Sequence, residues 1–276
     1  MSPPGAADII LAARRALLDA MDALAEHRSA LVLVGAQAIY LHTGNAPVAL
    51  AESTKDSDIA INPRQLRDHP LLEQAMRQAG FTQNASTSQP GSWLSPDGVP
   101  VDLMVPEQLA GAGSRRSGRV PPHSDRATRR AIGLEAAVVD QAPMRIAALD
   151  PSDTRTIEMN VAGPATLLVA KLHKLGERQG TAGRLLDKDA HDVYRLLVAT
   201  ESAPMAATLR RLREHELCER VTHDALVYLE QMFAAGPEAL GSTMAGRAEQ
   251  LVGDPATVRA SASALAADLL ALLSQK

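Results

Sequence analysis

The sequence predicts an α/β fold: an N-terminal domain with a mixed β-sheet flanked by helices, followed by a C-terminal helical bundle. Strand-like and helix-like segments alternate up to residue 162. Beyond Gly163 and Pro164 the apolar residues recur almost wholly at helical spacing, up to residue 276. We therefore expect an α/β domain over residues 1–162 and a helical domain over residues 163–276.

The first elements follow from periodicity. Residues 7–27 carry an apolar stripe typical of an amphipathic helix. The continuous apolar segment 31–34 ends at Gly35 and is typical of a strand buried on both faces, after which residues 36–42 can form a helix. Residues 45–53 look like a loop insertion, and residues 57–61 alternate as a strand does.

The following segments complete the predicted order. Asn62 and Pro63 favour the start of a helix that ends at Gly80 and that Pro70 should break or kink. A turn-forming segment at 95–98 predicts a hairpin over residues 91–105. We expect an exposed, arginine-rich loop over 111–130 that runs into a helix. Short strands are then predicted at 145–149 and 156–161, and helices near 165–177, 186–199, 204–215, 220–234 and 256–274.

The composition excludes some classes of function. Among 276 residues, 28 are Lys or Arg and 32 are Asp or Glu, so the net charge of -4 repels polyanions overall. Two Phe, three Tyr and one Trp are too few to stack successive bases of a single strand. The single Cys218 cannot form an internal disulfide or a thiolate metal site. With no signal layout and no apolar run near the roughly 20 residues of a membrane helix, we expect a cytoplasmic protein without a membrane partner.

Three acidic residues form the candidate site. Asp56 and Asp58 lie two apart at the start of a predicted strand, where both side chains would point to one face. Asp102 lies in a later apolar strand, where an unpaired carboxylate would be costly to bury. On adjacent strands the three could hold two Mg²⁺ ions, and Gly35 would let backbone N–H groups approach a triphosphate. The pair could equally be a capped turn or a solvated strand end, Gly35 a turn glycine, and Asp102 a buried acid paired with an arginine.

The order of these motifs resembles a known family. Val34-Gly35-Ala36, the segment 54–59 and Val101-Asp102-Leu103 are similar to the core of the nucleotidyltransferase superfamily related to DNA polymerase beta. Segments 169–175 and 184–193 resemble later motifs of the AbiEii-like toxins, the nucleotidyltransferases of abortive-infection and MenT-type toxin–antitoxin systems. The resemblance spans roughly residues 30–199.

The resemblance implies roles for particular residues. Asp56 and Asp58 would ligate Mg²⁺, and Asp102 would complete the metal site or act as a base. Asp189 would orient Lys171 or contact the nucleotide. The nucleotide, an NTP, would be bound by Gly35, Ala36, Lys55, Lys171 and Lys174. Two features depart from the family: Ala36 has no hydroxyl for a phosphate, and the interval from Gly35 to Asp56 is long.

The same resemblance implies transfer of NMP from an NTP to the 3′ end of tRNA, with release of pyrophosphate, by a toxin restrained by a cognate antitoxin. Two alternatives stay open. The acceptor could be a small molecule, such as an aminoglycoside, or a protein side chain, and the chain could be an inactive nucleotide-binding or interaction module, as Ala36 suggests. An RNA acceptor would be held through its phosphates by Arg115, Arg116 and Arg119, unless this stretch is simply a solvated face.

Overall fold

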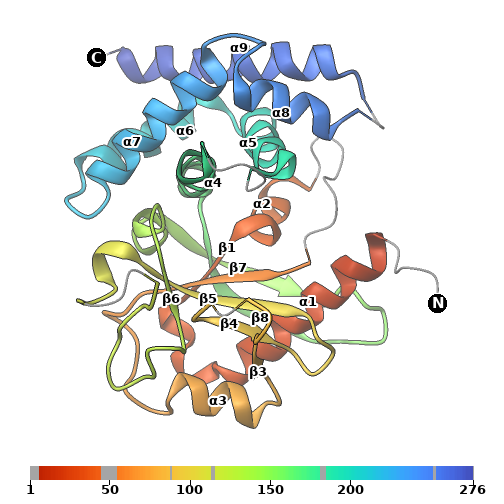
Figure 1. Cartoon of the computed structure of the whole chain (residues 1–276), viewed down its shortest axis with the longest axis vertical. Helices are drawn as coiled ribbons and strands as arrows, with labels where there is room; N and C mark the ends of the chain where they lie inside the picture. The colour runs from red at the N-terminus through yellow and green to blue at the C-terminus, as the bar shows by residue number, and fades with distance from the viewer. Residues whose placement is uncertain are drawn as a thin grey trace. The chain divides into compact units, whose positions relative to one another are not determined.

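The computed structural model describes residues 6–44, 55–87, 89–112, 116–180, 185–250 and 253–275. These residues form two compact units, one of Met1–Ala38 and Ser53–Ala162 and the other of Ile39–Glu52 and Gly163–Lys276. Helix α2 (Gly35–Thr43) therefore begins in the first unit and ends in the second (Figure 1). The predicted insertion at 45–53 lies outside the described residues.

The first unit is built on one mixed β-sheet. Its strands follow the order β3-β4-β5-β2-β1-β8-β7, and β6 pairs with β5. Strand β1 is antiparallel to β2 and parallel to β8, while β2 is parallel to β5. This arrangement confirms the predicted fold class of the first half. The bounds are β1 (Leu31–Val34), β2 (Ser57–Ile61), β3 (Thr82–Gln83), β4 (Ser92–Leu94), β5 (Pro100–Pro106), β6 (Arg129–Ala131), β7 (Gln141–Ala147) and β8 (Thr156–Ala162).

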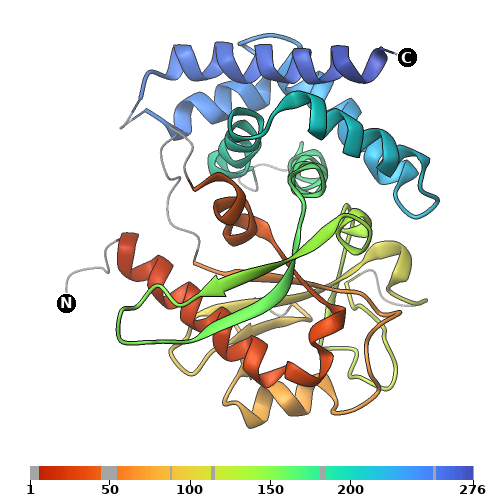
Figure 2. The ribbon, with the colours of Figure 1, turned by 180° about the vertical axis from the view of Figure 1, so that it is seen from behind.

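Two helices accompany the sheet. Helix α1 (Ala6–Ala23) contacts β2 and β5 as well as α3 (Leu72–Gln78), and Figures 1 and 2 both show α1 running along the sheet. Its apolar stripe includes Leu17, Leu18 and Met21, which are fully buried. Burial of these side chains stabilises the unit by removing apolar surface from water.

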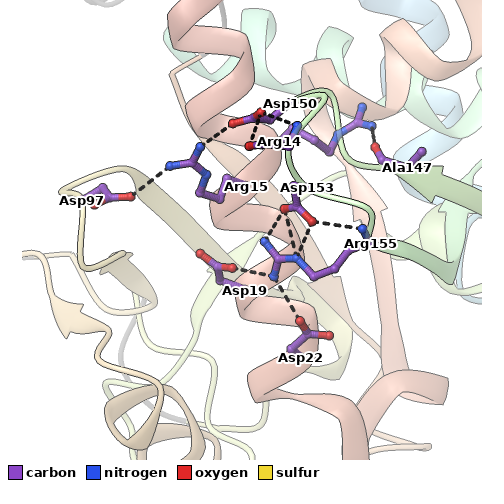
Figure 3. A network of polar contacts seen from close by, with 10 residues as sticks. Arg14, Arg15, Asp19, Asp22, Asp97, Ala147, Asp150, Asp153 and Arg155 are labelled. Carbon is purple, nitrogen blue, oxygen red and sulfur yellow. Dashed lines mark hydrogen bonds and ion pairs between the residues drawn. The ribbon is translucent and has the colours of Figure 1, made fainter.

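A network of charged side chains fixes α1 against the loop between β7 and β8 (Figure 3). The guanidinium of Arg155 lies 2.7 Å from carboxylate oxygens of Asp153 and Asp19 and 3.1 Å from one of Asp22. Arg15 contacts Asp150 at 2.8 Å. The hydrogen bonds from Arg155 lower the pKa of Asp153 to about 2, so this carboxylate is ionised near neutral pH.

The second unit is helical, as predicted. The helix α5 packs on α8, α8 on α9, α4 on α7 and α6 on α9. A π-helical turn over Glu230–Ala234 continues the seventh helix, and the eighth has no counterpart in the prediction. The bounds are α4 (Pro164–Arg178), α5 (Asp187–Ala199), α6 (Ser202–Glu214), α7 (Glu219–Leu229), α8 (Leu240–Ala248) and α9 (Pro255–Ser274).

Helix α9 corrects one expectation. Its 20 residues include a window with a mean hydropathy of 1.4, so by length and composition it could cross a membrane. No segment of this kind was expected from the sequence. The helix packs on α5, α6 and α8, and 28% of the window is buried in the structure.

One predicted helix is shorter than expected and another is wrong. The helix expected from Pro63 to Gly80 is confined to α3: the Asn62 side chain accepts a hydrogen bond from the N–H of Arg64 and closes a turn, and α3 begins only after Pro70, which was expected to break or kink the helix. The basic stretch expected to run into a helix instead forms β6, which pairs with β5 through Met104 and Val105.

Candidate active site

Two of the three predicted carboxylates lie side by side in the sheet. In the parallel register of β2 and β5, Asp58 is the partner of Asp102. On the other side of β2, Asp58 is the partner of Val34, the last residue of β1. Register partners on neighbouring strands point to the same face and lie about 4.8 Å apart at the backbone. The fold therefore brings Asp58 and Asp102 together from positions far apart in the sequence.

Gly35 determines how closely α2 approaches this pair. Its φ is +70°, a conformation that residues with a Cβ rarely adopt. A Cβ built at Gly35 would lie 2.2 Å from Oδ2 of Asp58 and 2.9 Å from Cγ. The carboxylate of Asp58 thus occupies the space that any other side chain would need. The positive end of the helix dipole there favours a negative charge.

Asp102 already has a cationic partner. Its Oδ2 lies 3.0 Å from Nη2 of Arg129. Burial raises the pKa of Asp102 and the charge of Asp58 adds to the rise, although Arg129 and a hydrogen bond from Ser92 oppose it. The pKa of Asp102 therefore lies above its usual value, because one guanidinium does not fully offset the cost of burying the charged carboxylate. The alternative in which Asp102 is paired with an arginine is therefore realised.

A polar cluster holds the beginning of β2 in place. The buried Gln37 of α2 donates to Oγ of Ser57 at 2.6 Å and accepts from Nε of Arg14 at 3.1 Å. Ser57 in turn donates to the carbonyl oxygen of Ala13 at 3.0 Å. These bonds join α1, α2 and β2 directly behind Asp58. Neither Gln37 nor Arg14 belongs to a recognised motif, so the sequence alone does not single them out.

Asp56, the third predicted carboxylate, lies immediately before β2. Strand β2 begins at Ser57, so Asp56 and the exposed Lys55 precede it, and strand alternation does not direct their side chains. No group of three His, Cys, Asp or Glu side chains in the described ranges is arranged to hold a metal ion. The structure pairs Asp58 with Asp102 in register, and the role of Asp56 as a third metal ligand stays a prediction. Ala36 is buried, at 6% exposure.

The predicted helical-domain residues form a separate cluster within the second unit. Nζ of Lys171 lies 2.9 Å from Asp189 and 2.6 Å from Asp192, and its side chain is only 8% exposed. Burial opposes the charge of Lys171, but the two carboxylates outweigh it and raise its pKa. Lys174 and Arg178 also contact Asp189, at 3.0 and 3.1 Å. Both lysines therefore pair with carboxylates, but the side chain of Lys171 is buried whereas that of Lys174 is partly exposed.

The candidate acceptor residues lie in the loop before β6. Arg116 and Arg119 are exposed, and Arg119 pairs with Asp125 at 3.2 Å. Arg126 bonds to the side chain of Gln83 at 2.9 Å. Arg115 lies outside the described residues.

Comparison with known proteins gives no sequence match: neither a protein-family model nor a curated protein matches the chain. Among solved structures, the chain is similar to JHP933 from Helicobacter pylori, with 14% identity, a TM-score of 0.40 and coverage of 96% of this chain and 93% of that one. It is also similar to a candidate nucleotidyltransferase from H. pylori, with 15% identity, a TM-score of 0.41 and coverage of 96% of each chain.

Proposed function

We propose that this protein is a Mg²⁺-dependent nucleotidyltransferase that moves NMP from an NTP to a hydroxyl group. The observation that carries this proposal is the register of Asp58 and Asp102 on adjacent parallel strands, directly beside the glycine that opens α2. Paired carboxylates provide the oxygen ligands that Mg²⁺ prefers, and a helix N-terminus reached through glycine suits a phosphate.

The residues present fit a magnesium ion. Mg²⁺ is usually held by one or two carboxylates and completes its shell with water and substrate phosphate oxygens. Asp58 and Asp102 supply that number. Because Gly35 has no Cβ, the beginning of α2 lies close to Oδ2 of Asp58 without a side-chain clash. Asp56, two residues before Asp58, is proposed as a further ligand from the resemblance alone.

In the proposed transfer of NMP, the residues around Asp58 and Asp102 would have different roles. When bound, Mg²⁺ would supply charge neutralisation for the phosphates and orientation of the attacking oxygen. Backbone N–H groups at Gly35 and Ala36 would bind phosphate oxygens, since Ala36 offers no hydroxyl. From the resemblance, Asp102 is proposed to complete the metal site or to accept the proton of the acceptor hydroxyl. The hydroxyl oxygen bonds to the α-phosphorus, the bond from that phosphorus to the bridging oxygen breaks, and pyrophosphate leaves.

The resemblance assigns the nucleotide to Lys171 and Lys174 of the second unit, and their ion pairs bear on these two roles. We assign Lys171 to ordering Asp189 and Asp192 rather than to direct phosphate contact, because its ammonium is buried between these carboxylates. Lys174 is the better candidate for contact with the nucleotide, since 34% of its side chain is exposed. Lys55, which is exposed next to the acidic motif, is retained as a second candidate.

For the acceptor we propose the 3′ end of tRNA, in the cytoplasm, with a cognate antitoxin that restrains the activity. The exposed arginines at 116 and 119 support an RNA acceptor, because an acidic chain needs a local basic surface to contact phosphates. Recognition by base stacking is disfavoured by the scarcity of aromatic residues.

The acceptor is tested by incubating the protein with Mg²⁺, each α-labelled NTP in turn, and total tRNA. We expect label in tRNA, removable by 3′ exonuclease. Label found only in protein, or only in an added aminoglycoside, would refute tRNA as the acceptor while preserving the chemistry. NTP binding without any transfer would favour an inactive nucleotide-binding module.

The basic surface is tested with the double variant Arg116→Gln/Arg119→Gln. It should raise the KM for tRNA and flatten the salt dependence of transfer, with little effect on the KM for NTP. The matched control removes two exposed arginines of α6, Arg211 and Arg213, and should leave both constants unchanged. Equal effects of the two double variants would contradict a local role for the basic loop.

A further inference from the structure

Two buried histidines contact the segment that links β2 to α3. His27 lies in a 3₁₀ turn (Ala25–Ala30) just before β1, and His123 lies in the loop that precedes β6. The two residues are 0% and 5% exposed. Their rings meet edge to face, with centroids 5.6 Å apart and planes at 82°. Two histidines that are distant in the sequence are therefore neighbours inside the first unit.

His123 binds the segment through both of its ring nitrogens. Nδ1 accepts a hydrogen bond from the backbone N–H of Leu72, the first residue of α3, at 3.1 Å. Because Nδ1 needs its lone pair for this bond, the ring is neutral and carries its proton on Nε2. Nε2 then donates to the carbonyl oxygen of Arg67 at 3.0 Å. The neutral imidazole thus satisfies one of the N–H groups that have no partner within α3.

A neighbouring bond holds His123 beside the start of α3. The backbone N–H of Ser124 donates to Oε2 of Glu73 at 3.1 Å, and Glu73 is the second residue of α3. The two segments therefore exchange hydrogen bonds in both directions. The bond between Ser124 and Glu73 does not require a neutral histidine, whereas the bond between Leu72 and His123 does.

His27 contacts the same segment. Its Nε2 lies 2.8 Å from the carbonyl oxygen of Pro70. A carbonyl oxygen can only accept, so Nε2 carries the proton of this ring. Nδ1 of His27 is buried and has no hydrogen-bond partner among the described residues. A second proton, on Nδ1, would create a buried N–H group without an acceptor, which is costly.

The surroundings disfavour a positive charge on either ring. Burial lowers the pKa of both histidines, and the charge of His27 lowers that of His123 further. Charged groups of both signs lie near the rings: Arg67 and Glu26 near His27, and Asp68 and Glu73 near His123. The three carboxylates and the bound carbonyl oxygens favour the charged rings, but burial outweighs them. Both histidines are therefore neutral near pH 7 in this arrangement.

We propose that His27 and His123 form a pH-sensitive latch, which holds residues 67–72 in place while both rings are neutral and releases them when a ring gains a proton. A proton on Nδ1 of His123 would occupy the lone pair that binds Leu72. A released histidine titrates near pH 6.5. The latch is therefore complete above about pH 6.5 and weakens below it, because the released state takes up more protons. It does not depend on the proposed nucleotidyl transfer.

The latch is tested by hydrogen exchange of the Leu72 amide, measured by NMR from pH 7.5 to 5.5 and corrected for the intrinsic pH dependence of exchange. Protection of this amide should fall at least about tenfold in wild type, because a released histidine gains a proton over this range. In His27→Gln/His123→Asn the fall should be less than about threefold. Gln can still donate to Pro70 and Asn can still accept from Leu72, but neither side chain titrates.

The matched control is His223→Asn, which removes an exposed histidine and should behave as wild type. A fall of less than about threefold in wild type, or an equal fall in the double variant, would overturn the latch.

The ring resonances of the wild-type protein give a second readout that needs no variant to fold. At pH 7.5, ¹⁵N NMR of the imidazoles should show His123 with its proton on Nε2 and none on Nδ1. Both His27 and His123 should titrate with midpoints below pH 6.5. A protonated Nδ1 of His123 at pH 7.5, or a midpoint above pH 6.5 for either ring, would overturn the proposal.

Discussion

Replacing Gly35 with alanine tests the packing of Asp58 against α2. At a φ of +70°, an alanine costs about 1–2 kcal/mol because its Cβ clashes with the backbone. Its Cβ would also lie 2.2 Å from Oδ2 of Asp58, so the carboxyl group must rotate away, at about 0.5–1.5 kcal/mol. The free energy of unfolding should therefore fall by about 2–3 kcal/mol, which lowers the Tm by roughly 5–10 °C.

Gly98 provides a matched control for this experiment. It has nearly the same backbone conformation, with φ at +77°, but a Cβ there meets nothing within 4 Å. Gly98→Ala should carry the backbone cost alone and keep wild-type Mn²⁺ binding. Gly35→Ala should be less stable than Gly98→Ala in urea unfolding and should bind Mn²⁺ more weakly. Equal stability and equal metal binding in the two variants would refute the close contact between Gly35 and Asp58.

Two further predictions concern ion pairs away from the carboxylate pair. Lys171→Met should lower the free energy of unfolding by about 3–5 kcal/mol, because Asp192, 3% exposed, would lose its cation; an unchanged urea midpoint would contradict this. Arg155→Met should lower the Tm at pH 6, but the difference from wild type should shrink as the pH falls from about 4 to 2. The pKa of Asp153 is depressed to about 2 in the folded protein. The ion pair therefore stabilises the fold fully above the pKa of Asp153 in the unfolded chain, and this stabilisation is lost as the carboxylate becomes protonated. A difference in Tm that is undiminished at pH 2 would exclude this pair as the cause.

Local pattern was sufficient for much of the fold. The strands β1 and β2 have the predicted bounds, because a continuous apolar run and strict alternation are both dictated by burial. Helices such as α4 and α5 follow strong apolar stripes. Helix α8 was missed, since its glycines and serine weaken helical propensity and its packing on α5 and α9 stabilises it instead.

The candidate site shows where sequence reasoning stops. The order of motifs correctly suggested that the strands of Asp58 and Asp102 could be neighbours, and the structure pairs these residues in register. The partnership of Asp102 with Arg129 could not be predicted, because it depends on β6, a strand of only three residues that pairs at long range. The charge of the arginine-rich stretch indicates only an exposed loop. The ion pairs of Lys171 likewise need the packing of α4 on α5.

The most direct test of the central claim is pyrophosphate release from NTP in the presence of Mg²⁺ and tRNA, with wild type compared with Asp58→Asn and Asp102→Asn. Both substitutions nearly preserve side-chain shape while removing a charge. We expect the wild type to release pyrophosphate unless EDTA is present, and each variant to lose at least about 100-fold of this rate with its fold intact. Undiminished release by either variant would contradict the assignment of Asp58 and Asp102 as the catalytic pair.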